Sequence, residues 1–193
     1  MKGKILLLFF ITIVCSSCQN INHSTALSSE TKSGQSGSSN NEVLSMSIGD
    51  YDLKGEFYDE MLRNPIDHDY EVEFNEFQNS KETITTLEWG ALESKYAEIW
   101  DKELNQIYQT LLSKLDREPR EALIKSQKEW LQYHLGETEF VEKTFINNGY
   151  LGSQGSVSLG RVIKERIRQR TMQLFEYRYL LDGEVEFLYQ SNK

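Results

Sequence analysis

Large side chains recur at intervals of three to five positions from residue 65 to residue 181, which is the period of amphipathic α-helices. The first helical segment begins at Pro65, a residue that suits a first helical turn. Three longer segments follow, over about 87–115, 119–147 and 159–181. The positions that we expect on their inner faces are, in order, Ile66, Tyr70, Phe74 and Phe77 or Gln78; Leu87, Ala91 or Leu92, Tyr96, Ile99 or Trp100, Leu104, Ile107, Leu111 and Leu115; Ala122, Leu123, Ser126, Trp130, Tyr133, Glu137, Val141 and Phe145; and Leu159, Ile163, Ile167, Arg170, Leu174, Tyr177 and Leu181.

Strong stop signals separate these segments. Asn147-Asn148-Gly149 ends the third segment, and Asp182-Gly183 ends the fourth. Because short connections make sequential helices antiparallel neighbours, we expect an all-α fold: an antiparallel bundle of three long helices plus a short N-terminal helix. The closing residues 184–188 alternate weakly, which fits either a short strand or a frayed tail.

The composition excludes several classes of function. The chain has 193 residues with 21 basic and 30 acidic side chains, a formal net charge of -9. A protein that neutralises phosphates needs an excess of Lys and Arg, so nucleic acid is not an expected partner. Three histidines and two cysteines leave little room for a zinc site, a Cys/His nucleophile or a disulfide framework. We therefore expect a binding protein rather than an enzyme, with no cofactor, no metal and no small-molecule substrate.

The first residues have the pattern of an export signal. Lys2 and Lys4 precede an apolar run over 5–14, and the small residues Ser16 and Ser17 stand directly before Cys18. Residues 1–17 are thus predicted to be a lipoprotein signal peptide, with lipid attached to Cys18. The alternative is an ordinary secretory signal with two incidental cysteines. The first interpretation predicts an exported protein, lipid-anchored to a bacterial membrane, whose domain faces the periplasm or the cell exterior.

The charges are unevenly distributed behind this anchor. Residues 18–45 are a predicted flexible Ser/Gly/Asn tether, 46–63 an acidic lead-in, 64–181 the helical domain and 182–193 a C-terminal tail. Residues 50–82 carry eleven acids against three bases, whereas residues 161–178 carry six bases against two acids. Either the acidic first part packs beside the basic last helix, or it forms a surface that attracts a cationic partner.

Few residues suggest chemistry. Asp67-His68-Asp69 holds metal-type ligands, but adjacent helical residues point about 100° apart and do not converge on one ion. His134 is expected to have a polar or half-buried structural role. The glycine-rich segment 149–160 is either a plain connection between helices or a mobile recognition loop. In the second interpretation, its candidate partner-binding residues are Tyr150, Ser153, Gln154 and Ser156.

Three segments resemble one family. The run Trp100-Asp101-Lys102-Glu103-Leu104-Asn105-Gln106-Ile107-Tyr108 is similar to the D-x-E-L-N-x-x-Y helix of the LprI-type lysozyme-inhibitor-like domain, and residues 126–133 resemble that family's Q-x-x-W-x-x-Y-R segment. Arg170 with Leu174 fits a closing R-x-x-x-L. His134 departs from the motif, which has Arg there, and Thr138 and Val162 stand where many members carry cysteines. The motif residues of this chain are Asp101, Glu103, Leu104, Asn105, Tyr108, Gln127, Trp130, Tyr133, Arg170 and Leu174.

The resemblance covers about residues 64–181 and implies an all-helical, exported and often lipid-anchored protein; for the family's namesake it implies inhibition of lysozyme. The first functional hypothesis is a membrane-tethered module that inhibits a lysozyme-type cell-wall hydrolase by occluding its cleft. C-type lysozymes are cationic, so an acidic protein has the right sign of charge to meet one. The alternative is a structural or adaptor lipoprotein that docks on another envelope protein and inhibits no lysozyme.

Overall fold

The computed structural model describes residues 55–80 and 83–191, so the predicted signal peptide, the lipidation site Cys18 and the tether lie outside the described residues. Every regular element within the described ranges is a helix, which confirms the all-α prediction. The described elements are α1 (Glu56–Leu62), α2 (Pro65–Ser80), α3 (Thr86–Lys114), α4 (Arg117–Val141), the π-helical turn η2 (Glu142–Ile146) and α5 (Gln154–Asp182).

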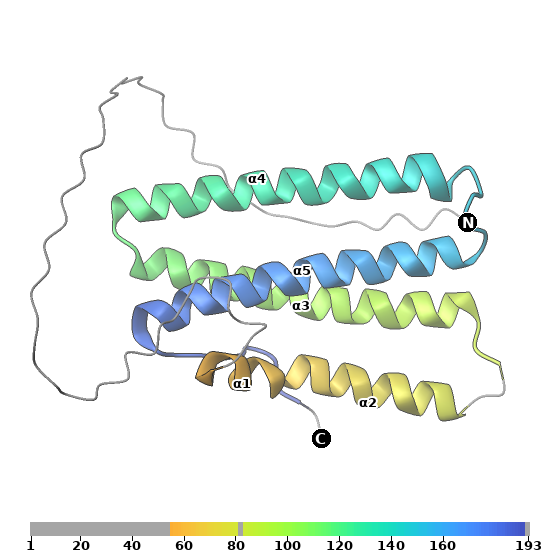
Figure 1. Ribbon diagram of the computed structural model, residues 1–193, viewed down its shortest axis with the longest axis horizontal. Helices are drawn as coiled ribbons and strands as arrows, with labels where there is room; N and C mark the ends of the chain where they lie inside the picture. The colour runs from red at the N-terminus through yellow and green to blue at the C-terminus, as the bar shows by residue number, and fades with distance from the viewer. Residues whose placement is uncertain (1–54, 81–82, 192–193) are drawn as a thin grey trace, which may run out of the picture. The chain divides into compact units, whose positions relative to one another are not determined.

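The three long helices α3, α4 and α5 are antiparallel to their sequence neighbours, as predicted (Figure 1). The most extensive packing joins α3 to α5, whereas α2 lies against α3, α1 against α5, and α4 against α5. The core between these helices is large and apolar. Its best-buried side chains, each at most 1% exposed, include Tyr96, Trp100, Leu104, Leu111, Leu174 and Phe175.

The helix ends follow from local chemistry. Pro65 is the first residue of α2, and the buried Asn64 accepts a hydrogen bond from the Asp67 backbone N–H at 2.8 Å. Thr85 and Glu88 form a reciprocal capping box at the start of α3. The predicted stop at Gly183 is confirmed, because this residue ends α5 with a left-handed φ of 72°.

One helix went unpredicted. The segment Glu56–Leu62, within the predicted lead-in, forms α1 and buries Phe57 and Met61. These two residues are four positions apart, so they lie on one face of a helix that is only seven residues long. A segment this short carries too little periodic signal to be separated from an irregular one.

Several expected core positions are exposed instead. Leu87 is 82% exposed because the buried positions of α3 begin only at Leu92, while Leu181 is 53% exposed in the last turn of α5. On α4, the predicted inner positions Leu123, Trp130 and Val141 are buried or partly buried. Tyr133, however, is 58% exposed and its neighbour His134 is buried, so the prediction is wrong by one residue at this position. One residue corresponds to a rotation of about 100° around the helix axis.

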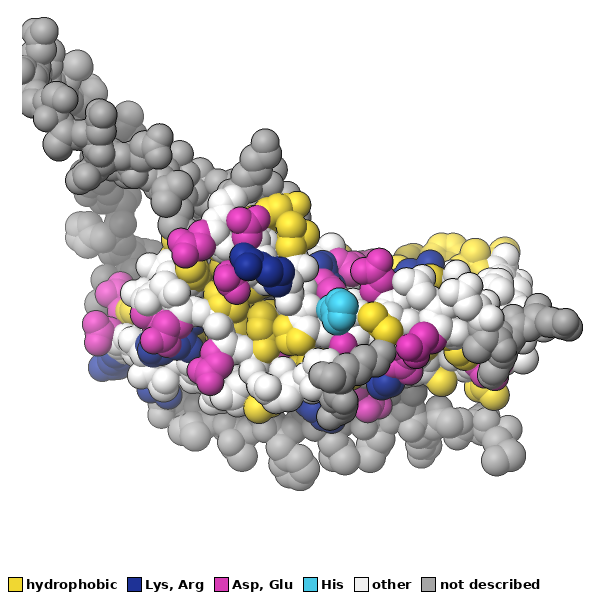
Figure 2. Space-filling view, turned by 90° about the horizontal axis from the view of Figure 1, so that it is seen from below, with side chains coloured by type: hydrophobic (Ala, Val, Ile, Leu, Met, Phe, Trp, Pro, Cys, Tyr) yellow, Lys and Arg dark blue, Asp and Glu magenta, His cyan; other side chains and the backbone are white. Residues whose placement is uncertain are grey.

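Many acidic groups of the first two helices have partners inside the fold. Arg168 of α5 binds the Asp67 carboxylate at 2.7 Å, and the Tyr179 hydroxyl donates to Glu56 at 2.8 Å. Glu73 of α2 pairs with Lys95 of α3. Figure 2 shows that Asp and Glu side chains on the α1–α2 face are interspersed with basic ones. The contacts with α5 favour the interpretation in which the acidic first part packs beside the basic last helix.

The described residues also bear on the membrane. None of the helices between residues 55 and 191 combines the length and the apolar character that a transmembrane span requires.

Candidate partner-binding surface

Exposed apolar side chains gather on α4 and the segment that follows it. Of the thirteen large apolar side chains that are exposed among the described residues, seven lie between residues 124 and 151. Exposed apolar residues that contact one another are typical of protein-binding surfaces, whereas scattered ones are ordinary. The seven are Ile124, Tyr133, Leu135, Phe140, Phe145, Tyr150 and Leu151.

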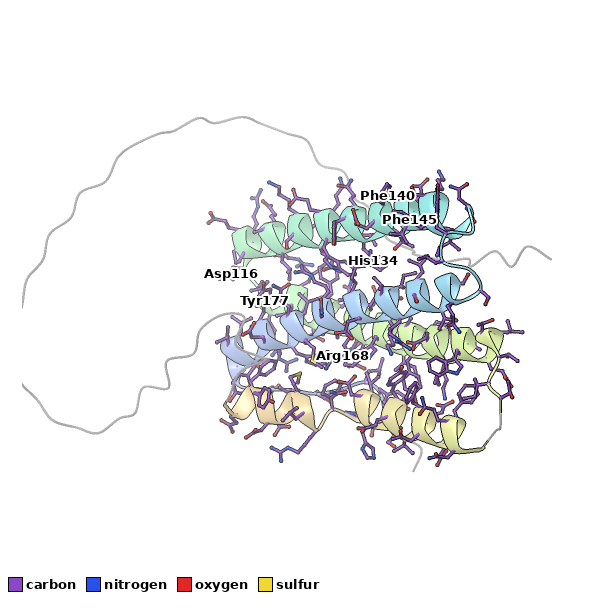
Figure 3. The ribbon with its side chains drawn as sticks, turned by 45° about the vertical axis from the view of Figure 1, so that its right-hand side comes forward. Asp116, His134, Phe140, Phe145, Arg168 and Tyr177 are labelled. Carbon is purple, nitrogen blue, oxygen red and sulfur yellow. The ribbon has the colours of Figure 1, made fainter. Side chains whose placement is uncertain are left out.

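The densest part of this cluster is a row of three rings. Phe140 and Phe145 meet edge to face with their centroids 5.8 Å apart, and Phe145 meets Tyr150 in the same manner at 6.3 Å. Phe140 is 54% exposed, Phe145 38% and Tyr150 74%. We call Phe140, Phe145, Tyr150 and the adjoining Leu151 the aromatic end. Figure 3 shows Phe140 and Phe145 next to each other at the end of α4.

The π-helical turn explains how the first two rings come together. Residues five apart on a regular α-helix point about 140° away from each other. In η2 the backbone N–H of Asn147 donates to the carbonyl of Glu142, five residues earlier, at 2.9 Å. This wider turn has more residues per revolution and brings Phe145 onto the side of Phe140. Phe145 was predicted to belong to the core face, and that prediction is wrong for the same reason.

The loop after η2 is short and tied down. Gly149 and Gly152 adopt left-handed φ values of 74° and 58°. The Asn148 side-chain amide donates to the carbonyls of Lys143 and Thr144 at 3.2 and 2.9 Å. A Cβ on Gly155 would lie 2.8 Å from Ile146 Cδ1 and 2.9 Å from Leu151 Cβ, so only glycine allows the loop to approach α5 this closely.

The predicted recognition loop is longer than the observed one. Helix α5 begins at Gln154, so Gln154 and Ser156 are exposed residues of its first turn, and Ser153 immediately precedes the helix. The prediction of a loop to Gly160 is therefore wrong. Serine and glycine are weak helix formers, but the close contact at Gly155 and the burial of Val157 hold this turn against the fold. Only Tyr150 and Ser153 of the predicted set lie outside a helix.

The charges around the aromatic end are mostly acidic. Residues 136–155 contain the three acids Glu137, Glu139 and Glu142 and one base, Lys143. Lys143 pairs with Glu139, and its hydrogen bond and positive charge lower the pKa of that carboxyl. The stretch that carries the aromatic end is thus net acidic, which suits a cationic partner, and Arg166 of α5 is a base that reaches this stretch, donating to Thr138 Oγ1 at 3.4 Å.

The family-motif residues mainly hold the bundle together. Arg170 of α5 is 7% exposed and donates from Nε to Gln127 Oε1 at 2.9 Å and from Nη2 to Ser126 Oγ at 3.1 Å, both on α4. Leu104 and Leu174 are core residues. This arrangement links α4 to α5 through polar side chains.

Other motif residues on α3 are also engaged within the fold. Asn105 donates to the Asp101 carbonyl at 2.8 Å, and burial raises the pKa of the Asp101 carboxyl. Tyr108 is partly buried against the core, where burial raises the pKa of its hydroxyl. Glu103 is buried and binds the end of the chain.

The departure from the motif at His134 has a visible consequence. His134 is 4% exposed and stacks on Trp130 with ring centroids 5.1 Å apart, between α4 and α5 (Figure 3). Arg166 donates to the His134 carbonyl at 3.1 Å. Burial, and to a lesser extent the charge of Arg166, lowers the pKa of His134 to about 4. His134 is therefore a neutral packing residue near pH 7.

The side chains of Asp67, His68 and Asp69 do not point toward a common site. Asp67 binds Arg168, Asp69 accepts from Tyr189 at 2.9 Å, and His68 is exposed. Within residues 55–80 and 83–191 no group of three His, Cys, Asp or Glu side chains is placed to hold a metal ion.

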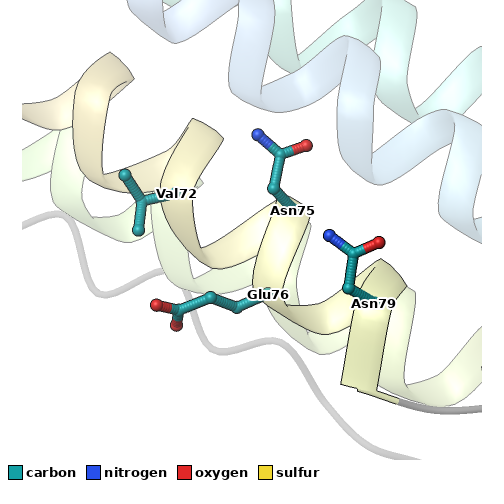
Figure 4. Close-up of a pocket in the computed structure, with 4 residues that line it drawn as sticks. All are labelled: Val72, Asn75, Glu76 and Asn79. Carbon is teal, nitrogen blue, oxygen red and sulfur yellow. The ribbon is translucent and has the colours of Figure 1, made fainter.

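A shallow, open depression on α2 is a further surface feature (Figure 4). Its lining residues all come from this one helix, so no second element among residues 55–80 and 83–191 brings a polar group toward it, and it supports no functional assignment. The lining residues are Val72, Asn75, Glu76 and Asn79.

Sequence reasoning pointed to Tyr150 but missed Phe140, Phe145 and Leu151. A signal was present in the aromatic triplet spaced five residues apart, 140, 145 and 150, which no regular α-helix places on one face.

Comparison with known proteins places the chain in a family. The family model described as lysozyme inhibitor LprI matches residues 78–174, which is just over half of the chain. No curated protein and no solved structure matches the chain significantly. The matched range contains all ten motif residues and the aromatic end. The chain belongs to the LprI lysozyme-inhibitor family.

Proposed function

We propose that this protein is an exported, lipid-anchored inhibitor that binds a lysozyme-type cell-wall hydrolase and occludes its substrate cleft with the aromatic end. The observation that carries the proposal is the exposed row Phe140, Phe145 and Tyr150 within the range that matches a lysozyme-inhibitor family. Family membership supplies the class of partner, and the aromatic end supplies a surface for it.

The chemistry of the surface suits this role. Aromatic residues dominate the binding energy of protein interfaces, particularly where they are held rigidly. The contact at Gly155 and the hydrogen bonds of Asn148 hold the loop beneath Tyr150, so little conformational entropy is lost on binding. Tyr150 is 74% exposed and its hydroxyl is able to donate a hydrogen bond to a carboxylate in a lysozyme cleft.

The charge of the chain supports the same partner. Without Lys2 and Lys4, which lie in the predicted signal peptide, the formal charge of -9 becomes -11, because two positive charges are removed. A cationic lysozyme would be attracted to such a protein, and the acids around the aromatic end would favour docking there.

An inhibition titration tests the proposal. Purified residues 19–193 should slow lysozyme-catalysed lysis of cell walls in a saturable manner. Tyr150→Ala and Phe140→Ala should each weaken inhibition about tenfold or more, the equivalent of about 1.4 kcal/mol, because each removes an exposed ring. Leu87→Ala is the matched control, since Leu87 is equally apolar and 82% exposed but lies at the start of α3. A wild-type chain that neither binds lysozyme nor slows lysis would contradict inhibition and favour the adaptor function.

The membrane anchor is tested separately. In bacteria, the full chain should take up labelled palmitate and sediment with membranes, whereas Cys18→Ala should lose the label and leave the membrane fraction. Cys15→Ala serves as the control and should keep both properties. Uptake of labelled palmitate by Cys18→Ala at the wild-type level would refute lipidation at this residue.

A further inference from the structure

Residues 184–191 bind to the helices as an extended peptide. The side chains of Val185, Phe187 and Tyr189 are partly buried against the core. Those of Glu186 and Leu188, between them, are exposed. This alternation with a period of two is that of an extended strand whose one face is bound. The segment forms no β-bridge, so the predicted short strand is wrong, and its packing also excludes a frayed tail.

One buried carboxylate holds the backbone of this segment. Glu103 of α3 is 1% exposed, and its Oε1 and Oε2 accept hydrogen bonds from the backbone N–H groups of Leu188 and Tyr189 at 2.8 and 3.0 Å. A carboxylate that accepts two main-chain N–H groups recognises an extended peptide whatever its side chains are. These two amides offset part of the cost of burying the Glu103 charge, although burial still raises the pKa of this carboxyl.

Residues of α5 and α2 contact side chains of the segment. The Phe187 ring lies 4.6 Å from that of Phe175 on α5, which is fully buried. Asp69 of α2, which is 7% exposed, accepts from the Tyr189 hydroxyl and from the Ser191 hydroxyl, both at 2.9 Å. Recognition thus combines a main-chain clamp with an aromatic contact and a hydroxyl contact.

We propose that Asp69, Glu103 and Phe175 form a peptide-binding site, the tail site, whose ligand is an extended segment of the pattern Phe-x-Tyr-x-Ser. The C-terminal segment 184–191 occupies the site in the folded chain. None of the contacts with Glu103, Phe175 or Asp69 depends on the covalent link to α5, so the same segment binds when supplied as a separate peptide.

The covalent link decides when a separate peptide is able to bind. A segment joined to its site by a short connection competes at an effective concentration in the millimolar range. The wild-type chain therefore excludes a free peptide at micromolar concentration. A substitution that weakens the binding of the attached segment but leaves the tail site intact should make the site accessible to a free peptide.

A matched pair of variants at Leu188 makes this change. The Leu188 side chain is 56% exposed, so Leu188→Ala removes little packing and keeps the backbone N–H. Leu188→Pro removes the backbone N–H that donates a hydrogen bond to Glu103. The probe is a fluorescent synthetic peptide of residues 184–191, added to residues 19–193 of wild type and of each variant. We expect Leu188→Pro to bind it at least tenfold more tightly than Leu188→Ala or wild type, and a peptide with Phe187→Ala and Tyr189→Ala not to bind.

Two results would overturn the tail site. One is a Leu188→Pro chain that keeps its helical circular dichroism and cooperative melting but binds the peptide no better than Leu188→Ala. The second needs no variant: amide hydrogen exchange of the wild-type chain should show slow exchange at Leu188 and Tyr189, and exchange there as fast as in the free peptide would refute the clamp even if Leu188→Pro fails to fold.

Discussion

At the scale of single residues, His134 makes the stability of the bundle depend on pH. Its Nδ1 has no hydrogen-bond partner among the described residues, and it is packed between Trp130 and the α5 helix that carries Arg166. The fold therefore accepts the neutral imidazole and disfavours the charged one, which lowers the pKa of His134 from 6.5 to about 4.

We predict a loss of stability in mild acid that belongs to this residue. A group whose pKa is depressed by folding contributes its full stability above the unfolded pKa of 6.5 and loses it as the pH falls toward the folded value of about 4. Between about pH 7.5 and about pH 5, the wild type should lose about 1–2 kcal/mol more of its free energy of unfolding than His134→Phe. Urea titrations at both pH values measure the difference. His68→Gln, at an exposed position, should behave like wild type, and an equal loss in His134→Phe would contradict the assignment.

At the scale of elements, the contact between α5 and the preceding loop depends on one missing side chain. Gly155→Ala introduces a Cβ at 2.8 Å from Ile146 Cδ1 and 2.9 Å from Leu151 Cβ, so we predict that it destabilises the protein by about 1–2 kcal/mol despite the better helix propensity of alanine. Gly136→Ala on α4, where nothing lies within 4 Å, should instead stabilise the protein by about 0.5–1 kcal/mol. Thermal unfolding measures both, and shifts of the same sign would contradict this account.

Helices with a strong apolar period could be predicted from the sequence. The side of each helix that faces the core was harder to predict. Helix α3 followed its pattern because Tyr96, Trp100 and Leu104 form one continuous buried face. Helix α4 has large apolar residues on more than one side, and only its contacts with α5, such as Arg170 with Gln127, decide which side is inside. Those contacts are polar and distant in sequence, so no local period reveals them.

The candidate site was predictable to a smaller degree. Tyr150 stood out because it follows a helix stop in a glycine-rich segment. Phe140 and Phe145 looked like helix residues with different orientations, because a π-helical turn leaves no propensity signal that distinguishes it from a regular turn.

At the scale of the whole molecule, the acidic residues have two electrostatic roles. Asp67, Glu73 and Glu56 each bind a side chain of another helix. These acids stabilise contacts between helices, while the net charge acts on partners from a distance. Binding to a cationic hydrolase should therefore divide in the same way, with the net charge setting the rate of encounter and the aromatic end setting the lifetime of the complex.

We predict that the association rate constant with lysozyme falls several-fold between about 50 mM and about 300 mM salt, while the dissociation rate constant changes little. Tyr150→Ala should raise the dissociation rate constant and leave the salt dependence of association unchanged. Surface plasmon resonance at several salt concentrations measures both constants. A salt effect that lies mainly in dissociation would contradict this division.

The π-helical turn at Glu142–Ile146 makes the aromatic end depend on a residue count. A π-helical turn is equivalent to one amino acid inserted into a regular helix. Deleting a single residue such as Thr144 would restore the regular winding and place Phe145 four positions after Phe140, about 40° around the helix, so these two rings would stay on one side. Keeping every residue but restoring the regular winding would instead leave the two rings about 140° apart. The contact between Phe140 and Phe145 therefore requires that the extra residue and the wider turn occur together, and a one-codon deletion that removes both would keep the rings side by side.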